Sequence, residues 1–155
     1  MAVKQRVIVD ADACPKACLR VIQKLASRFG YEVVTVASFN HQILNDRHLI
    51  VGAEPQATDI AIANLVAAGD VVITQDLGLA GLVLGKKAAV ITPQGRIVRD
   101  DKIDFLLEER DLMARFRQGG GRTKGPAKRT VADDRRFEAS LIALLEERLA
   151  GAAEE

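Results

Sequence analysis

The chain has 155 residues, of which 48% are hydrophobic, so it is long enough to bury one sizeable core. Its 22 basic and 21 acidic side chains give a net charge of +1, and the overall charge therefore indicates no particular partner. No segment approaches the roughly 20 apolar residues that a membrane span needs, and the N-terminal residues lack the apolar stretch of a signal peptide. We predict one cytoplasmic domain over residues 1–150, a frayed tail at 151–155 and no membrane partner.

Cys14 and Cys18 are the only cysteines, which is too few for a disulfide framework or a four-cysteine zinc site. No second Cys or His pair supplies a matching half of a zinc site. We predict reduced thiols at the partly buried start of a helix.

The first half of the chain alternates short β-branched runs with segments of helical periodicity. The pattern predicts a strand at 6–9, a helix that begins near Pro15 and ends at Gly30, and a second strand at 33–37. A polar stretch and a short strand at 49–51 follow. Thr58 is typical of a helix cap, and the helix that it begins ends at Gly69.

The second half continues the alternation. It predicts a strand at 71–74, a short helix at 77–84, a strand at 88–91, a turn at 93–95 and a weak returning strand at 96–98. An amphipathic helix at 103–116, a loop at 119–128 and a last helix at 132–149 complete the chain. Alternating strands and helices favour right-handed crossovers, so we expect an α/β fold, a three-layer sandwich with a mostly parallel central sheet.

Acidic residues follow two of the predicted strands. Ligands of an open parallel sheet bind beyond the carboxyl ends of its strands. Asp10 and Asp12 leave the first strand, Asp76 follows the strand at 71–74, and Asp59 opens a helix whose amino end faces the same edge. These four residues are expected to converge. Asp70 precedes its strand, which places it on the opposite edge, some 10 to 20 Å away from Asp76.

Several ionised carboxylates in one place repel one another, and a divalent cation relieves that repulsion. Mg²⁺ and Mn²⁺ prefer oxygen ligands, and such a site activates water and stabilises the leaving oxygen of a phosphodiester. Each aspartate also has a simpler interpretation, because Asp12, Asp59 and Asp76 stand where a helix amino terminus favours negative charge. Taken together, they indicate a metal site with Asp10, Asp12 and Asp76 as its catalytic residues and Asp59 as a further ligand.

Two other segments carry candidate substrate-binding residues. Asn40 and His41 follow the second strand, where an amide and an imidazole can contact a phosphate; a solvated loop is the alternative. His48 is interpreted as a surface residue. Residues 115–129 contain six basic side chains, no acidic one and three consecutive glycines. A basic loop of this kind can follow a nucleic-acid backbone, although connectors have similar compositions. The substrate-binding candidates from this segment are Arg122, Lys124 and Lys128.

Three stretches, VDADACP at 9–15, VASFNH at 36–41 and GDVVITQD at 69–76, together resemble the bacterial YaiI/YqxD family of uncharacterised proteins. Gly125-Pro126, Asp134-Arg135 and Phe137 look like later landmarks of that family, but Lys124 stands where a glycine is expected before Gly125. The family is similar in pattern to PIN-like domains, many of which are metal-dependent ribonucleases. The resemblance implies a PIN-like fold and a Mg²⁺- or Mn²⁺-dependent nuclease, for which RNA is favoured over DNA as the substrate. It also implies one metal-binding set, namely Asp10, Asp12, Asp59 and Asp76.

Two other functions fit parts of the sequence. A buried strand that ends in Asp-x-Asp resembles haloacid-dehalogenase-like phosphatases, in which Asp10 would attack phosphorus, Asp12 would serve as acid and base, and Thr74 would form the second motif. No later lysine with a paired acidic motif supports that interpretation. The third possibility is a nucleic-acid-binding module without catalysis, based on residues 115–129.

Overall fold

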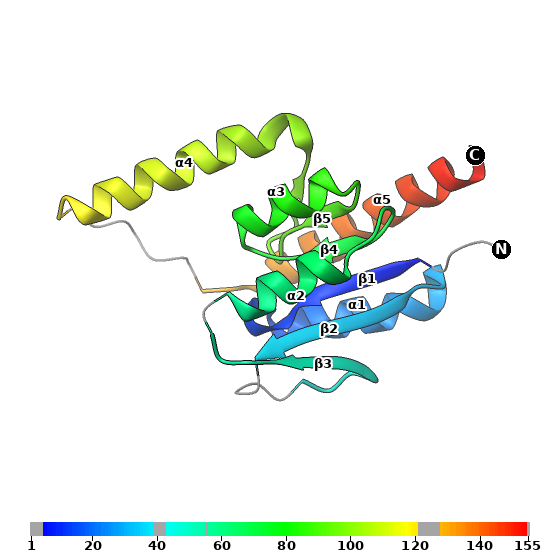
Figure 1. Ribbon diagram of the computed structural model, residues 1–155. Coiled ribbons are helices and arrows are strands. Elements are labelled where there is room, and N and C mark those ends of the chain that lie inside the picture. The colour runs from blue at the N-terminus through cyan, green and yellow to red at the C-terminus, as the bar shows by residue number, and fades with distance from the viewer. Residues whose placement is uncertain (1–4, 39–42, 55, 121–127, 155) are drawn as a thin grey trace.

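A six-stranded sheet forms the centre of the molecule, with strand order β3-β2-β1-β4-β5-β6 (Figure 1). The computed structural model describes residues 5–38, 43–54, 56–120 and 128–154. All neighbouring strands are parallel except β6, which is antiparallel to β5. The mostly parallel α/β sheet is therefore confirmed. The strands are β1 (Arg6–Asp10), β2 (Glu32–Ser38), β3 (Arg47–Val51), β4 (Val71–Ile73), β5 (Ala89–Ile91) and β6 (Ile97–Val98).

Helices cover both faces of the sheet (Figure 1). On one face, Val7 and Val9 of β1 pack with residues of α1 and α5, and on the other face Ile8 packs with residues of α2 and α3. Alternate residues of a strand point to opposite faces, which is why a strand buried on both sides is apolar throughout. The helical segments are the 3₁₀ turn η1 (Ala11–Ala13), α1 (Lys16–Phe29), α2 (Ala57–Leu65), α3 (Leu77–Gly85), α4 (Asp100–Gln118) and α5 (Val131–Glu154).

Local sequence explains where α1 begins and ends. Pro15 precedes its first residue, and Gly30 follows its last residue with a φ of 69°. The Gly30 amide donates a hydrogen bond to the carbonyl oxygen of Ala26, as expected for a left-handed residue that closes a helix. The chain can then turn directly into β2, which pairs with β1.

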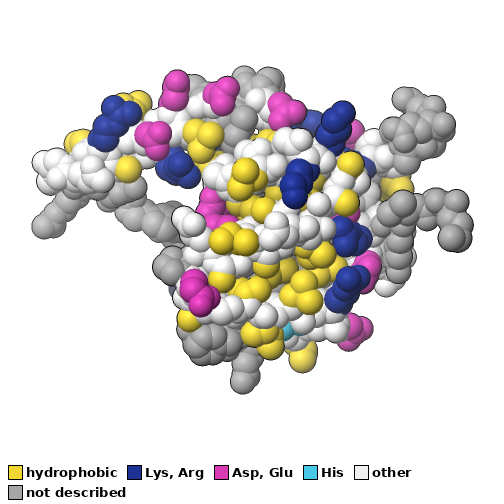
Figure 2. Space-filling view, in the orientation of Figure 1, with side chains coloured by type: hydrophobic (Ala, Val, Ile, Leu, Met, Phe, Trp, Pro, Cys, Tyr) yellow, Lys and Arg dark blue, Asp and Glu magenta, His cyan; other side chains and the backbone are white. Residues whose placement is uncertain are grey.

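The helix α4 is present where the sequence predicts it, but much of its apolar surface remains exposed. It packs against α3, and its later part extends away from the sheet (Figure 1). Met113 and Phe116, both part of the predicted apolar stripe, are 46% and 54% exposed. Hydrophobic side chains are accordingly visible along this helix in Figure 2.

Further details differ from expectation. Thr58, predicted to cap its helix, lies inside α2, which begins at Ala57 and ends at Leu65 instead of at Gly69. The helix α5, predicted for residues 132–149, extends through Glu154. His48, interpreted as a surface residue, is only partly exposed within β3, where its Nδ1 lies 2.7 Å from the Thr35 hydroxyl oxygen. β3 begins at Arg47, so His48 belongs to the edge strand of the sheet, where pairing with β2 covers part of its side chain. Over the described ranges, no helix has the length and apolar character needed to cross a membrane.

A buried ion pair joins the beginnings of the two central strands. Arg6 Nη2 lies 2.6 Å from Asp70 Oδ2, and the side chain of Asp70 is only 7% exposed. Asp70 also accepts a hydrogen bond from the Ala67 amide, and Arg6 donates one to the carbonyl oxygen of Leu65. Asp70 therefore has a structural role at the amino edge of the sheet, opposite the predicted site.

We predict that Asp70→Ala lowers the free energy of unfolding by about 3 kcal/mol, because it leaves the Arg6 guanidinium without its buried partner. Chemical denaturation at neutral pH measures this change. Asp46→Ala, which alters an exposed residue just before β3, is the matched control and should change stability little. Equal stability of both variants would mean that the ion pair contributes nothing.

Candidate functional site

The strand order reverses between β1 and β4, the two central strands of the sheet. The chain continues from β1 to β2 on one side, whereas β4 lies on the other side and leads to β5. Such a reversal opens a crevice beyond the carboxyl ends of the strands. A cleft of about 450 Å³ lies there. Its lining residues are Asp10, Asp12, Ala13, Ser38, Ala53, Glu54, Thr58, Asp59, Gln75 and Asp76.

Asp10 is the most buried of the four predicted ligands. It ends β1, is 7% exposed, and accepts a hydrogen bond of 2.8 Å from the Thr74 hydroxyl. Burial raises the pKa of Asp10, the Thr74 hydrogen bond opposes that shift, and the charges of Asp12 and Asp76 add to it. The protein thus holds a carboxyl group in a place that disfavours its negative charge.

Asp76 and Asp59 form a pair of interacting carboxyl groups. Asp76 caps α3 by accepting a hydrogen bond of 3.0 Å from the Leu79 amide. Asp59, in the first turn of α2, lines the same cleft as Asp76, and burial together with the neighbouring Asp76 carboxyl raises the pKa of Asp59 to about 6. Two carboxyl groups that line one cleft and disfavour each other's charge can share a proton or be neutralised by a cation.

Asp12 lies in η1 and is oriented by the neighbouring elements. Its carboxylate accepts hydrogen bonds from the Ser38 amide, at 3.0 and 3.2 Å, and from the Thr58 hydroxyl, at 2.8 Å. The side chain therefore links η1 to the end of β2 and to the start of α2. These contacts turn the Asp12 carboxylate toward the wall formed by Ser38 and Thr58.

The four aspartates have the right chemistry to bind a divalent cation, because carboxylate oxygens are the ligands that Mg²⁺ and Mn²⁺ prefer. Their side chains are not gathered into a ready metal centre. Among the residues that the structure describes, no three His, Cys, Asp or Glu side chains form a group that holds a metal as they stand. The four predicted aspartates do line one cleft. Their role as ligands stays a prediction.

Sequence reasoning missed two charged residues beside the cleft. Glu54 lines the cleft from the loop after β3. Its position after a strand of the same sheet could have predicted this placement. Arg110 of α4 lines an adjoining groove of about 520 Å³ together with Asp59 and Asp76. The approach of α4 to α3 brings Arg110 there, and no local sequence pattern indicates that approach.

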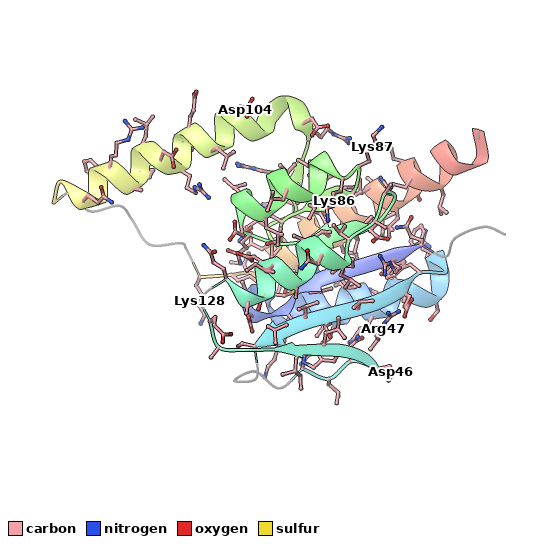
Figure 3. All side chains as sticks on the ribbon, viewed as in Figure 1. Asp46, Arg47, Lys86, Lys87, Asp104 and Lys128 are labelled. Atoms are coloured by element: carbon pink, nitrogen blue, oxygen red, sulfur yellow. The ribbon has the colours of Figure 1, made fainter. Side chains whose placement is uncertain are left out.

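The predicted substrate-binding residues are only partly described. Asn40, His41, Arg122 and Lys124 lie outside the described residues. Lys128 is exposed and lies at the end of the molecule where α2 begins (Figure 3). Arg129, the last basic residue of the same segment, forms intramolecular contacts. Its Nε donates a hydrogen bond to Asp134 Oδ1 at 2.6 Å, and its Nη2 donates one to Cys18 Sγ at 2.9 Å.

Comparison with known proteins gives a family and no activity. The family model described as "Uncharacterized BCR, YaiI/YqxD family" matches residues 8–147. A UPF0178 protein of Heliobacterium modesticaldum is 54% identical over 142 residues, which cover 92% of this chain and 97% of the relative. A UPF0178 protein of Clostridium tetani is 44% identical over 142 residues, covering 90% and 96% of the two chains. No solved structure matches the chain, so the PIN-like fold stays a prediction. Because the family model spans most of the sequence and the relatives align over nearly their whole length, the chain belongs to the YaiI/YqxD family of uncharacterized bacterial proteins.

Proposed function

We propose that the acidic cleft binds Mg²⁺ or Mn²⁺ and hydrolyses phosphodiester bonds of nucleic acid, with RNA preferred over DNA. The observation that carries this proposal is the shared cleft of Asp10, Asp12, Asp59 and Asp76 at the carboxyl edge of β1 and β4. Burial and mutual repulsion raise the pKa of Asp10 and of Asp59, which is the electrostatic condition that a cation relieves.

Each residue has a distinct part in the proposed reaction. Asp10, fixed by Thr74, and Asp76, fixed as the cap of α3, would hold the cation together with Asp12 and Asp59. When bound, the cation would offset the carboxylate repulsion and provide Lewis-acid activation of water and phosphate. Asp59 and Asp76 line the cleft together, and burial with the neighbouring Asp76 carboxyl raises the pKa of Asp59 to about 6 in the metal-free protein, so this pair is where a cation would relieve the most repulsion.

Basic residues around the cleft supply the contacts to the nucleic-acid backbone. Arg110 borders the groove beside Asp59 and Asp76, and Lys128 is exposed at the same end of the molecule (Figure 3). Contacts of this kind position a phosphate backbone without reading bases. Arg122 and Lys124 extend the proposed contact surface on sequence grounds.

A second function, hydrolysis of a phosphomonoester with Asp10 as nucleophile, is favoured by the Thr74 hydroxyl beside the Asp10 carboxylate. Against it, no lysine lines the cleft in the described part of the chain. A phosphoaspartate at Asp10 trapped with beryllofluoride, together with rapid turnover of a small phosphomonoester, would select this function over the nuclease.

Asp10→Asn should reduce Mn²⁺-dependent cleavage of labelled single-stranded RNA by about 10² or more, which corresponds to about 3 kcal/mol of transition-state stabilisation. The variant nearly preserves shape but removes the charge that holds the cation. Its melting temperature without metal should match or exceed that of the wild type, because burial disfavours the Asp10 charge. Single-stranded DNA, assayed in parallel, should be cleaved more slowly than RNA.

The matched control is Asp104→Asn, which removes the same charge from an exposed position on α4 (Figure 3) and should leave cleavage unchanged. Equal cleavage by a folded Asp10→Asn variant would refute the proposed site. Binding of RNA without cleavage by any of the proteins would instead select the non-catalytic binding module.

A pH prediction follows from Asp59, whose folded pKa of about 6 lies above the ordinary value of 3.8. A raised carboxyl pKa means that the folded state holds the proton more tightly, so this stabilising contribution is complete at low pH and is lost as pH rises from about 4 through 6. With a chelator present, Asp59→Asn should therefore be more stable than the wild type at pH 7.5. The advantage should shrink as the pH falls to 4.

Adding Mn²⁺ at pH 7.5 should reverse the order, because a cation that binds only the folded state raises the melting temperature. The increase should be larger for the wild type than for Asp59→Asn. Identical shifts in the two proteins would show that Asp59 takes no part in cation binding. Thermal melts across pH, with and without Mn²⁺, provide both measurements.

Replacing Arg122, Lys124 and Lys128 by alanine should weaken RNA binding and reduce the slope of log affinity against log salt, by about one for each phosphate that the variant no longer neutralises. Fluorescence anisotropy at several salt concentrations, in chelator, measures the slope. The control changes Lys86 and Lys87 to glutamine, at the far end of α3 (Figure 3). An unaltered slope in the triple variant would indicate that the segment only connects two helices and does not contact RNA.

A further inference from the structure

A groove of about 520 Å³ adjoins the acidic cleft and is lined by residues of α2, α3 and α4. It shares Asp59 and Asp76 with the cleft, so the two hollows meet at these residues. Its volume lies within the range of about 300 to 1,000 Å³ that is usual for pockets that bind small organic ligands. A molecule held at the acidic residues can therefore extend into the groove.

The groove has apolar walls that the fold leaves uncovered. Ile60 of α2 and Leu82 of α3 both line it and are 56% and 61% exposed, and the buried Leu79 lines it as well. Hydrophobic side chains are visible over these two helices in Figure 2. Large aliphatic side chains on two helices that border one groove offer surfaces against which a flat ring can pack.

The positions of the lining residues give the groove a direction. Asp59 and Asp76 stand at the amino ends of α2 and α3, where the groove meets the cleft. Ile60 and Asn64 lie four residues apart on one face of α2, and Leu82 lies six residues after Asp76 along α3. Because α2 and α3 pack against each other, the groove leads from an acidic end to an apolar end that carries an amide.

Polar groups stand at both ends of the groove. Arg110 lies at the acidic end, because a Cβ on Gly78 would be 3.1 Å from Asp76 Oδ1 and 3.7 Å from Arg110 Nη1. In the described part of the chain its guanidinium forms one ion pair, a 3.8 Å contact from Nε to Asp111 Oδ1. The exposed amide of Asn64 at the other end makes no hydrogen bond to a described residue. A guanidinium is suited to a phosphate, and a carboxamide is suited to the donor and acceptor edge of a nucleobase.

We propose that the groove binds the base of an unpaired nucleotide, next to the phosphate at the acidic cleft. This site rests on the proposed function of the cleft and specifies its substrate as single-stranded nucleic acid. The phosphate lies beside Arg110, the base packs between Ile60 and Leu82, and Asn64 contacts the edge of the base. A base inside a duplex is stacked and paired, and taking it out of the duplex is costly, so a duplex is a poor occupant.

The combination of groups favours a nucleotide over an apolar partner. An apolar peptide would cover Ile60 and Leu82 but would leave the guanidinium of Arg110 and the amide of Asn64 without partners, which is costly once water is excluded. A nucleotide supplies an anion for one end and a flat ring with donors and acceptors for the other. Its charge and its apolar surface thus match the two ends of the groove.

Leu82→Ser tests the base site on nucleic acid. Its matched control is Leu112→Ser, because Leu112 of α4 is 62% exposed and is not among the residues that line the groove. Fluorescence anisotropy with labelled single-stranded RNA, in chelator, should show about tenfold weaker binding by Leu82→Ser and unchanged binding by the control. A duplex of the same sequence should bind the wild type and both variants equally. Equal affinity of Leu82→Ser and the wild type for the single strand would overturn the proposal.

Two small probes separate the base from the phosphate. In calorimetry with Mg²⁺, the wild type should bind adenosine monophosphate about tenfold more tightly than ribose 5-phosphate, and Leu82→Ser should lose that preference. Arg110→Gln should weaken both ligands by the same factor, because it acts on the phosphate that they share. Loss of adenosine monophosphate binding with unchanged RNA binding would assign the groove to free nucleotides and overturn the proposal.

Cleavage assays keep the base site and the proposed nuclease separate. A wild type that cleaves RNA but shows no preference for adenosine monophosphate would retain the nuclease and refute the base site. Base-dependent binding without cleavage would support the base site and count against the nuclease. Methyl NMR of the wild type decides without any variant, since adenosine monophosphate, and not ribose 5-phosphate, should shift the signals of Ile60 and Leu82.

Discussion

The hydrogen bond from Thr74 to Asp10 is the contact on which the candidate site depends. It joins the segment after β4 to the last residue of β1, at the point where the strand order reverses. A buried carboxyl group needs such a partner, since leaving it unpaired is costly. The same Thr74 hydroxyl accepts a hydrogen bond from the Asp76 amide, and Asp76 in turn begins α3. One threonine thus positions two of the acidic residues and the helix that follows.

Much of the sheet follows from local sequence, because strands buried on both faces have no polar positions in their middle. The runs at 6–9 and 71–74 are of this kind and become β1 and β4. The direction of a strand decides which end of the sheet a following residue occupies, whatever the strand order. This is why the sequence predicts Asp10 and Asp76 at one edge and Asp70 at the other without knowledge of the topology. Asp70 indeed pairs with Arg6, at the first residue of β1.

The sequence could not reveal features that depend on how separate elements pack. The orientation of Asp12 depends on Ser38 and Thr58, which come from two other parts of the chain. Arg110 reaches the groove only because α4 packs against α3. The exposure of Phe116 has the same origin, since helical periodicity identifies an apolar stripe but not whether another element covers it.

Structural roles account for some of the acidic residues and leave one without an explanation. Asp76 caps α3, and Asp12 links three elements through its hydrogen bonds. Asp59 gains a modest benefit from the amino end of α2, but burial and the neighbouring Asp76 carboxyl raise its pKa to about 6. An asparagine at that position would fill the same space without the repulsion. A carboxyl group at this position is disfavoured by burial and by Asp76, and a cation would relieve both effects, so Asp59 gives the most direct support for the proposed cation site.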